Sequence, residues 1–217
     1  MKETAMTNSE SGTWHREVLS ATTEAALHSL RDAALVDPFY LAGGTGLALQ
    51  LGHRLSQDLD FFANDLFNEE PLLQRLQVLS DFSLVEKAPH TLHAVVQQTK
   101  VSFLGYRYPL LFTLLHFHGA AVADPRDIAC MKLSAIASRG TKRDFVDLYI
   151  ATRQLDLGKL LELFERKYAA TRYNRLHVLK SLTFFADAEK DPMPHMLMPL
   201  DWNEVRGFFL QETPKHY

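Results

Sequence analysis

Residues 40–62 read YLAGGTGLALQLGHRLSQDLDFF, and this stretch decides the fold. The short apolar segment 39–42 predicts a strand that runs into a pair of glycines, Gly43 and Gly44. Residues 45–51 predict a short helix that ends near Gly52. The chain therefore begins its core with a strand, a glycine turn and a helix.

A second strand is predicted for residues 58–62, after the polar turn 53–57. Asp58 and Asp60 point to the same side of this strand because side chains alternate across a strand. Two carboxylates side by side on a half-buried strand repel each other unless a cation offsets their charge. An Asp-x-Asp pair is also common on ordinary surfaces, but the apolar residues between and after these two indicate that the opposite face is buried.

The glycine pair and the aspartates together predict a site for a nucleoside triphosphate and a divalent cation. Glycines let the backbone approach a phosphate closely, and the N–H groups at a helix start receive its oxygens. Mg²⁺, or Mn²⁺, suits paired carboxylates because it completes its shell with phosphate and water. A Gly-Gly turn alone is usually only a turn, so this interpretation depends on the acidic strand that follows.

A second informative stretch, residues 124–149, reads DPRDIACMKLSAIASRGTKRDFVDLY. Lys132 falls in the middle of an apolar helical arc, so it must reach solvent or find an anion. That anion is a triphosphate, or Asp144 or Asp147 in an ion pair that joins two helices. The two aspartates are three residues apart and share a helix face. The helix dipole explains an acid at Asp144 in the first turn but not at Asp147.

The remaining pattern is mixed in the first half of the chain and helical in the second. We expect a flexible segment over residues 1–13, an α/β core over 14–122 and a helical subdomain over 123–217 that closes a cleft. Further helices are predicted for residues 14–35, 69–79, 157–168, 174–187 and 202–210, and further strands for 82–86, 92–97 and 100–105. Asp124 is a predicted N-cap, and Thr141 is predicted to open a capping box with Asp144.

Composition indicates a soluble protein. The 217 residues include one cysteine and carry a formal net charge of −3, which favours a cytoplasmic setting and gives no general attraction for nucleic acid. No apolar run is long enough to span a membrane. The most basic segment, residues 166–180, is either an RNA contact or a solvated helix face.

The two stretches resemble the AbiEii/AbiGii toxin family of nucleotidyltransferases, which belongs to the polymerase-β-like superfamily. The resemblance implies an α+β fold with a mixed sheet flanked by helices and a helical C-terminal half. It implies that Gly43, Gly44 and Thr45 hold the triphosphate, that Asp58 and Asp60 hold Mg²⁺, and that Lys132 with Asp144 or Asp147 completes the active site. Arg54 and Ser56 fall where the family keeps a basic residue and a hydroxyl, and Arg54 either contacts phosphate or solvates the turn.

The resemblance also implies a biological role. Such proteins act as the toxin of a bacterial toxin–antitoxin or phage-defence pair, with a protein antitoxin encoded alongside and tRNA as one nucleotide acceptor. The chain departs from the superfamily at one place, because Ser102 stands where a third carboxylate is expected. The alternative function is therefore a nucleotide-binding regulatory or partner-binding module with weakened catalysis.

Other metal or thiol chemistry is not predicted. His116 and His118 have no cysteine or carboxylate at ligand spacing near them, so these, like His90 and His93, are expected to be site-face or surface histidines. Cys130 lies on an apolar helix without a neighbouring base and is expected to be structural.

Overall fold

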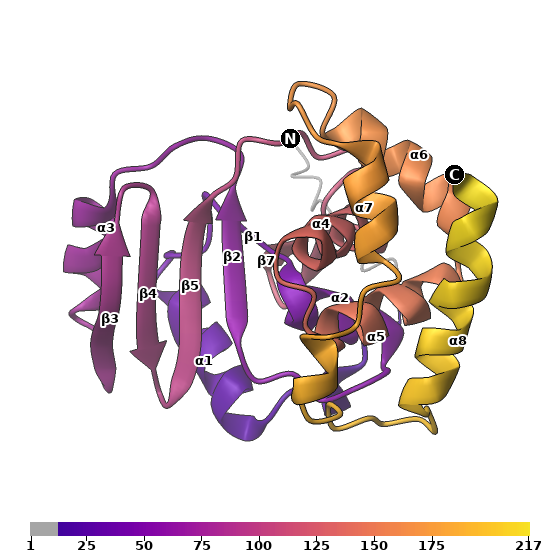
Figure 1. Ribbon diagram of the computed structural model, residues 1–217. Coiled ribbons are helices and arrows are strands. Elements are labelled where there is room, and N and C mark those ends of the chain that lie inside the picture. The colour runs from indigo at the N-terminus through magenta and orange to yellow at the C-terminus, as the bar shows by residue number, and fades with distance from the viewer. Residues whose placement is uncertain (1–12) are drawn as a thin grey trace, which may run out of the picture.

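The computed structural model describes residues 13–217 and contains, within that range, a seven-stranded mixed sheet (Figure 1). The strands lie in the order β3-β4-β5-β2-β1-β7-β6. Their bounds are β1 Tyr40–Leu41, β2 Leu59–Ala63, β3 Phe82–Ala88, β4 Thr91–Val96, β5 Thr99–Gly105, β6 Leu115–Phe117 and β7 Ala120–Val122. The predicted α+β class is confirmed, whereas the predicted flexible segment 1–13 lies outside the described residues except for Thr13.

The centre of the sheet carries the two strands that the opening stretch predicts. β1 pairs antiparallel with β2 and parallel with β7, and β2 pairs parallel with β5. This register sets Asp60 opposite Ser102, and β4 in turn sets His93 opposite Ser102. A row of polar side chains therefore crosses three adjacent strands.

The hairpin β6–β7 was not predicted. Each strand has only three residues, which is too short for alternation to be visible in the sequence. The turn between the strands uses left-handed backbone at His118 and Gly119, with φ values of 48° and 82°. Gly119 accepts this conformation readily, so the turn is tight enough to bring two short strands together.

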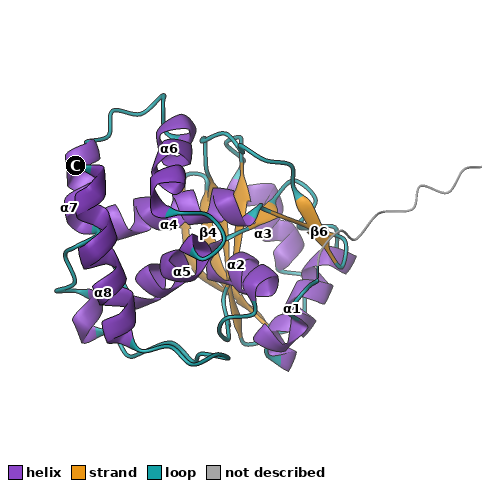
Figure 2. Cartoon of the chain, turned by 90° about the vertical axis from the view of Figure 1, so that its right-hand side faces the viewer, coloured by secondary structure: helices purple, strands orange, loops and turns teal. Residues whose placement is uncertain are grey.

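Helices surround the sheet, and Figure 2 shows α6, α7 and α8 gathered on the side away from α1. Their bounds are α1 Ala21–Asp32, α2 Gly43–Leu51, α3 Glu69–Leu76, α4 Pro125–Ser138, α5 Lys142–Thr152, α6 Leu157–Lys167, α7 Arg175–Ser181 and α8 Trp202–Glu212. Leucines of α1 and α3 pack with the sheet in one apolar core, and α4 to α8 share a second core. No helix among residues 13–217 is both long and apolar enough to cross a membrane.

Three sequence predictions about helices were wrong in detail. The helix predicted for 14–35 begins only at Ala21, because Ser20 caps it by accepting a hydrogen bond from the Thr23 N–H. The helix predicted for 174–187 ends at Ser181. Thr141 does not form a capping box, since its hydroxyl donates to the Asp144 carboxylate at 2.7 Å instead of accepting from the backbone.

A small apolar cluster joins the sheet to the helices beside the glycine turn. Tyr40 and Phe62 from the strands pack with Leu47 of α2 and Ile128 of α4. α2 and the end of β2 are thereby held against α4. The division into a core of residues 14–122 and a closing subdomain of residues 123–217 stays a prediction.

Candidate functional site

α2 starts with a pair of glycines, and neighbouring side chains leave no room for a Cβ at either position. Gly43 has φ +61°, and a Cβ placed there would lie 2.6 Å from Oδ2 of Asp60. A Cβ on Gly44 would lie 2.2 Å from Nη2 of Arg54. Ala42, at the N-cap position, has no side chain that can cap the helix. The first-turn N–H groups and the positive end of the helix dipole are therefore left for an anion.

Asp58 and Asp60 lie beside this helix start. Asp60 is largely buried, and burial is the main cause that raises its pKa above the usual 3.8, with Asp58 adding to the effect. The Ser102 hydroxyl and the Lys132 ammonium act in the opposite direction but do not cancel it. Asp58 is more open, with 43% of its side chain exposed, and its carboxylate lies 3.8 Å from Nη1 of Arg143. The pair carries negative charge that is only partly compensated.

Two hydroxyls fasten the helix to the acidic strand. Thr45 donates to the main-chain carbonyl of Asp58, and its hydroxyl also shares a 2.7 Å hydrogen bond with Ser56. Both side chains are buried. Thr45 and Ser56 therefore fix the position of Asp58 relative to Gly44.

Asp147 is the centre of a buried ionic cluster. Its carboxylate accepts hydrogen bonds from Arg54 Nε at 2.6 Å and Nη2 at 2.9 Å, it is hydrogen-bonded to Nε2 of His53 at 2.8 Å, and it lies 2.7 Å from Nζ of Lys132. Burial by itself raises the pKa of Asp147, but Lys132 and Arg54 outweigh it and hold the pKa well below 3.8. Arg54 also donates to the Leu55 carbonyl, so three of its five N–H groups bond to protein groups. Arg54 neither solvates the turn nor stands free.

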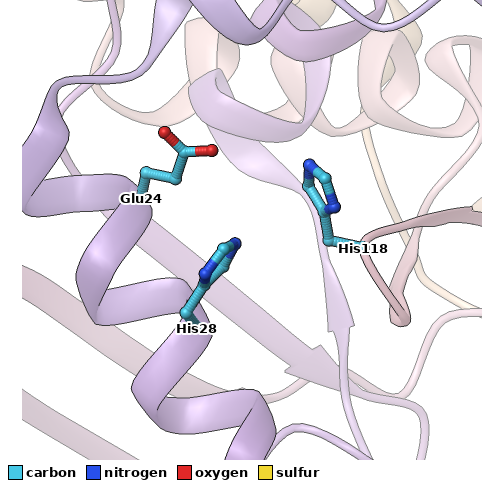
Figure 3. A group of neighbouring side chains, drawn as sticks. All are labelled: Glu24, His28 and His118. Carbon is cyan, nitrogen blue, oxygen red and sulfur yellow. The ribbon is translucent and has the colours of Figure 1, made fainter.

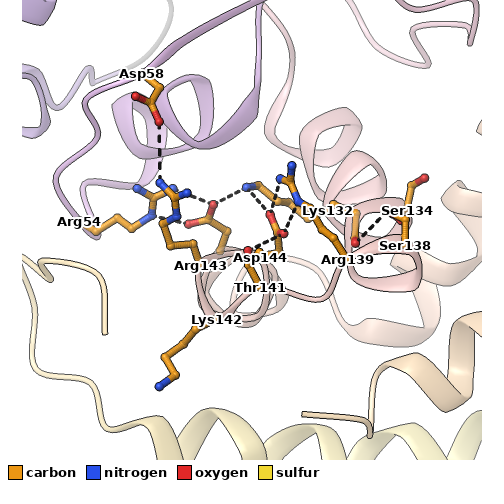
Figure 4. Close-up of polar contacts among 12 residues, drawn as sticks. Arg54, Asp58, Lys132, Ser134, Ser138, Arg139, Thr141, Lys142, Arg143 and Asp144 are labelled. Atoms are coloured by element: carbon orange, nitrogen blue, oxygen red, sulfur yellow. Dashed lines mark hydrogen bonds and ion pairs between the residues drawn. The ribbon is translucent and has the colours of Figure 1, made fainter. Parts of the chain in front are cut away.

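Asp144 is the second centre, and Figure 4 shows the side chains that converge on it. Lys132 donates to it at 3.0 Å, Arg139 Nε at 3.0 Å and the Thr141 hydroxyl at 2.7 Å. Burial by itself raises the pKa of Asp144, but these three partners outweigh burial and lower the pKa from 3.8 to about 2. Lys132 is thus held between Asp144 and Asp147, which aims its ammonium at the cavity beside Asp60.

The cavity has two adjoining compartments. The polar one, about 170 Å³, is lined by Gly44, Thr45, Arg54, Ser56, Asp58, Asp60, Lys132, Arg139, Thr141, Arg143 and Asp144. The wider one, about 420 Å³, shares Gly44, Asp60, Lys132, Arg139 and Asp144 with the first and adds Gly43 and the apolar side chains of Phe62, Leu104, Tyr106 and Met131. A charged compartment that opens into a half-apolar one suits a ligand with a phosphate end and a ring end. A larger cavity of about 550 Å³ near Phe39 and Leu72 is lined by Asp37 and Asp65 but by no lysine and no glycine helix start.

The structure brings together all the site residues predicted from the sequence: all but Asp147 line the two compartments, and Asp147 contacts Lys132 and Arg54 behind them. Their roles toward a ligand stay predictions. The sequence missed Arg139, Arg143 and Thr141, which lie in the quoted stretch 124–149 but carry no helical periodicity that marks them. It also missed His53, whose only signal is its position before Arg54.

The predicted basic segment 166–180 is smaller than the sequence indicated. Lys167 is fully buried, where it donates to Asp127 at 2.7 Å and to the Pro109 carbonyl at 2.8 Å. Tyr168 is also buried. Both are core residues, so neither belongs to an RNA-binding surface, and Arg175 is in an ion pair with Glu165. Cys130 is buried with its pKa raised by burial to about 12, as expected for a structural cysteine.

Comparisons with known proteins point in one direction. The family model described as nucleotidyl transferase AbiEii toxin, type IV TA system, matches residues 25–116 and 106–217. An uncharacterized protein of Aquifex aeolicus (strain VF5) is 36% identical to this chain over 200 residues. The aligned region covers 88% of this chain and 94% of the Aquifex protein.

Solved structures are similar in fold. The nucleotidyltransferase toxin MenT4 of Mycobacterium tuberculosis H37Rv aligns with a TM-score of 0.56 and 17% identity, covering 90% of this chain and 86% of its own. The antibiotic-resistance factor ANT(2'')-Ia aligns with a TM-score of 0.52 and 16% identity, covering 70% of this chain and 96% of its own. At these identities the likeness concerns the fold.

Proposed function

This chain belongs to the AbiEii family of nucleotidyltransferase toxins, and from that premise we propose that it transfers a nucleotide from a nucleoside triphosphate to a hydroxyl of RNA, with tRNA as the acceptor. One observation carries the proposal. Asp58, Asp60 and Lys132 line a single cavity at the uncapped start of α2. Carboxylates for a cation and donors for phosphate are the two requirements of phosphoryl chemistry.

A divalent cation fits the two aspartates. Their donor atoms are carboxylate oxygens, which Mg²⁺ prefers. The pKa of Asp60 is raised mainly by burial, with Asp58 adding to it, and a bound cation would favour the ionised carboxylate. When bound, Mg²⁺ neutralises the triphosphate and favours ionisation of the attacking hydroxyl. Asp58 and Asp60 would hold it, and Gly43 leaves the room that the Asp60 carboxylate needs.

Three basic side chains support triphosphate binding. Lys132 is fixed by its two aspartates, whereas Arg139 and Arg143 are at the mouth of the cavity with 65% and 59% of their side chains exposed. The contact of Arg143 with Asp58 is long, so Arg143 is free to turn to a phosphate once a cation neutralises Asp58. Guanidinium groups suit this role because they bind phosphate oxygens in pairs.

The acceptor hydroxyl needs a proton acceptor, and Ser102 is not one. His93 lies next to Ser102, with Nδ1 3.1 Å from the serine hydroxyl, and both line the wider compartment with Asp60. We assign the proton to Nε2 of His93. The acceptor oxygen then bonds to the α-phosphorus, the bond from that phosphorus to the bridging oxygen breaks, and pyrophosphate leaves.

A transfer assay tests the proposal. The protein is incubated with each labelled nucleoside triphosphate, Mg²⁺ and total tRNA, and compared with Asp58→Ala and Asp60→Ala. Asp65→Ala is the matched control, because Asp65 is an exposed acid just beyond the other end of β2. Label should reach tRNA with the wild type and the control and not with the two site variants. Tight nucleotide binding without transfer by the wild type would instead support the weakened binding module that Ser102 favours.

Two further measurements address the finer assignments. His93→Ala should lower kcat by about 10²–10⁴-fold, the usual contribution of a general base, whereas His90→Ala should not. Normal turnover by His93→Ala would remove His93 from the mechanism. Growth arrest on expression, relieved by the product of a neighbouring gene, would support the toxin role and an antitoxin partner; continued growth would count against it.

A further inference from the structure

Three ligand-type side chains meet away from the cavity, where α1 lies beside the turn between β6 and β7. Glu24 and His28 are four residues apart on α1 and therefore share a helix face. His118 comes from the turn between β6 and β7. One carboxylate oxygen and one ring nitrogen from each histidine lie within 4.8 Å of one another, and the three side chains point toward a common centre (Figure 3).

We propose that Glu24, His28 and His118 form a binding site for a divalent transition-metal ion, with Zn²⁺ as the preferred ion. Two imidazole nitrogens and one carboxylate oxygen are a donor set that Zn²⁺ accepts, with water in the fourth position. Within residues 13–217 no other group of three His, Cys, Asp or Glu ligands comes this close together. Mg²⁺ does not suit the set, because Mg²⁺ prefers oxygen ligands over imidazole.

The state of His28 supports a ligand at this place. Its Nε2 is buried and has no hydrogen-bond partner among the described residues. Leaving a buried polar atom without a partner is unfavourable, so such an atom marks a place where a bound water or ion is expected. A metal ion would accept the lone pair of this nitrogen directly.

Glu24 is prepared to act as the anionic ligand. Arg16 donates to one of its oxygens, and a carboxylate has a second oxygen that can bind a metal. Arg16 in this way orients the ligand from outside, as outer partners of metal sites do.

Closing the site requires a small movement. Ligand atoms around tetrahedral Zn²⁺ lie about 3.3 Å apart, and the donor atoms here lie within 4.8 Å of one another, so no pair needs to approach by more than about 1.5 Å. His28 and His118 already face each other, with ring centroids 5.5 Å apart at 69°. His118 lies in the two-residue turn of the β6–β7 hairpin, and Arg31 of α1 donates to its carbonyl at 3.1 Å, so the turn is already held beside α1. Metal binding would tie this hairpin to α1 and stabilise the edge of the sheet.

The sequence alone did not indicate this site. The segment around His116 and His118 contains no further ligand at suitable spacing, because Glu24 and His28 are about ninety residues away along the chain. Only the packing of α1 beside the β6–β7 turn brings them together. The site shares no residue with the cavity at Asp60, so it stands or falls independently of the proposed transfer reaction.

The inference is tested by measuring the affinity of the untagged, EDTA-treated protein for Zn²⁺. The protein competes for the metal with a chromogenic chelator. One equivalent of Zn²⁺ should bind, and Co²⁺ should give the visible absorption of a four-coordinate site. His28→Ala, His118→Ala and Glu24→Gln should each weaken binding by about tenfold or more. His116→Ala is the matched control, because His116 is an exposed histidine of the same hairpin.

Two checks keep the test decisive. Circular dichroism and the melting temperature of each variant establish that it is folded; if His28→Ala does not fold, Glu24→Gln and His118→Ala carry the comparison. Zn²⁺ should raise the melting temperature of the wild type and of Asp58→Ala, but not that of the three ligand variants. Wild-type affinity in all three ligand variants, or loss of zinc binding in Asp58→Ala, would overturn the proposal.

Discussion

Replacing Gly43 by alanine tests how the backbone of α2 positions the acidic strand. The added Cβ would lie 2.6 Å from Oδ2 of Asp60, whereas ordinary contacts begin near 3.4 Å. The carboxylate must therefore move by roughly 1 Å. A displacement of that size at a reacting centre costs about 10²-fold in rate. We expect Gly43→Ala to lower kcat/KM for nucleotide transfer by about 100-fold.

Alanine at this position also strains the backbone. With φ at +61°, a residue with a Cβ pays about 1–2 kcal/mol for left-handed geometry. Gly52, at the other end of the same helix, offers a matched control because its φ is +63°. A Cβ there would lie 2.4 Å from Nδ1 of His15, a partly exposed side chain that does not line the cavity. Both variants should lose about 1–2 kcal/mol of unfolding free energy, and only Gly43→Ala should lose activity.

The assay measures both quantities on both variants. Urea unfolding gives the stability change, and label transfer to tRNA at saturating Mg²⁺ gives kcat/KM. If Gly43→Ala transfers label as well as the wild type, the contact between the glycine turn and Asp60 has no part in catalysis. If the two variants lose activity equally, the loss comes from instability and the reasoning is refuted.

Three further predictions concern the buried charges. Asp147→Asn leaves the Lys132 and Arg54 charges uncompensated, so urea unfolding should show a loss of about 3–5 kcal/mol; a loss below about 1 kcal/mol would contradict the ionic cluster. Asp144 has its pKa lowered from 3.8 to about 2, which corresponds to about 2 kcal/mol of stability that is present above pH 4 and is lost as the pH falls through 2. Wild type should therefore be more stable than Asp144→Asn at pH 7 but not near pH 2, and a gap independent of pH would argue against this. Ionisation of Asp60 affects stability in the opposite direction. Because the pKa of Asp60 is raised in the folded protein, its ionised form destabilises the fold, and this cost is complete once the pH has risen through that pKa. Asp60→Asn should accordingly melt at a higher temperature than the wild type at pH 7.5 without metal. Mg²⁺ at ten times its Kd should stabilise the wild type by about 1.4 kcal/mol but not the variant, and the reverse order of melting temperatures would count against a cation site.

The part of the fold that the sequence predicts is the part where local chemistry decides the outcome. Gly43 and Gly44 between an apolar strand and a helix, and Asp58 and Asp60 in alternation, have few other structural solutions. Short elements are different, since β6 and β7 exist only because β1 offers β7 an edge to pair with. Likewise the helix expected from residue 14 starts at Ala21, because an N-cap at Ser20 overrides apolar periodicity.

The site was predictable as a set of residues but not as a network. Lys132 was expected to meet Asp144 or Asp147, and it meets both. Which other groups join them depends on packing between segments, as with Arg54, which lies 93 residues from Asp147 in the sequence. The same limit made Lys167 look like a surface cation, since its partner Asp127 lies 40 residues away.

A crystal structure with Mg²⁺ and a non-hydrolysable nucleoside triphosphate tests the central claim most directly. The account predicts a cation bound by carboxylate oxygens of Asp58 and Asp60 at about 2.0–2.1 Å. The phosphates should lie over the first turn of α2, within reach of Lys132. A cation and triphosphate bound anywhere else, with Asp58 and Asp60 contacting neither, would contradict it.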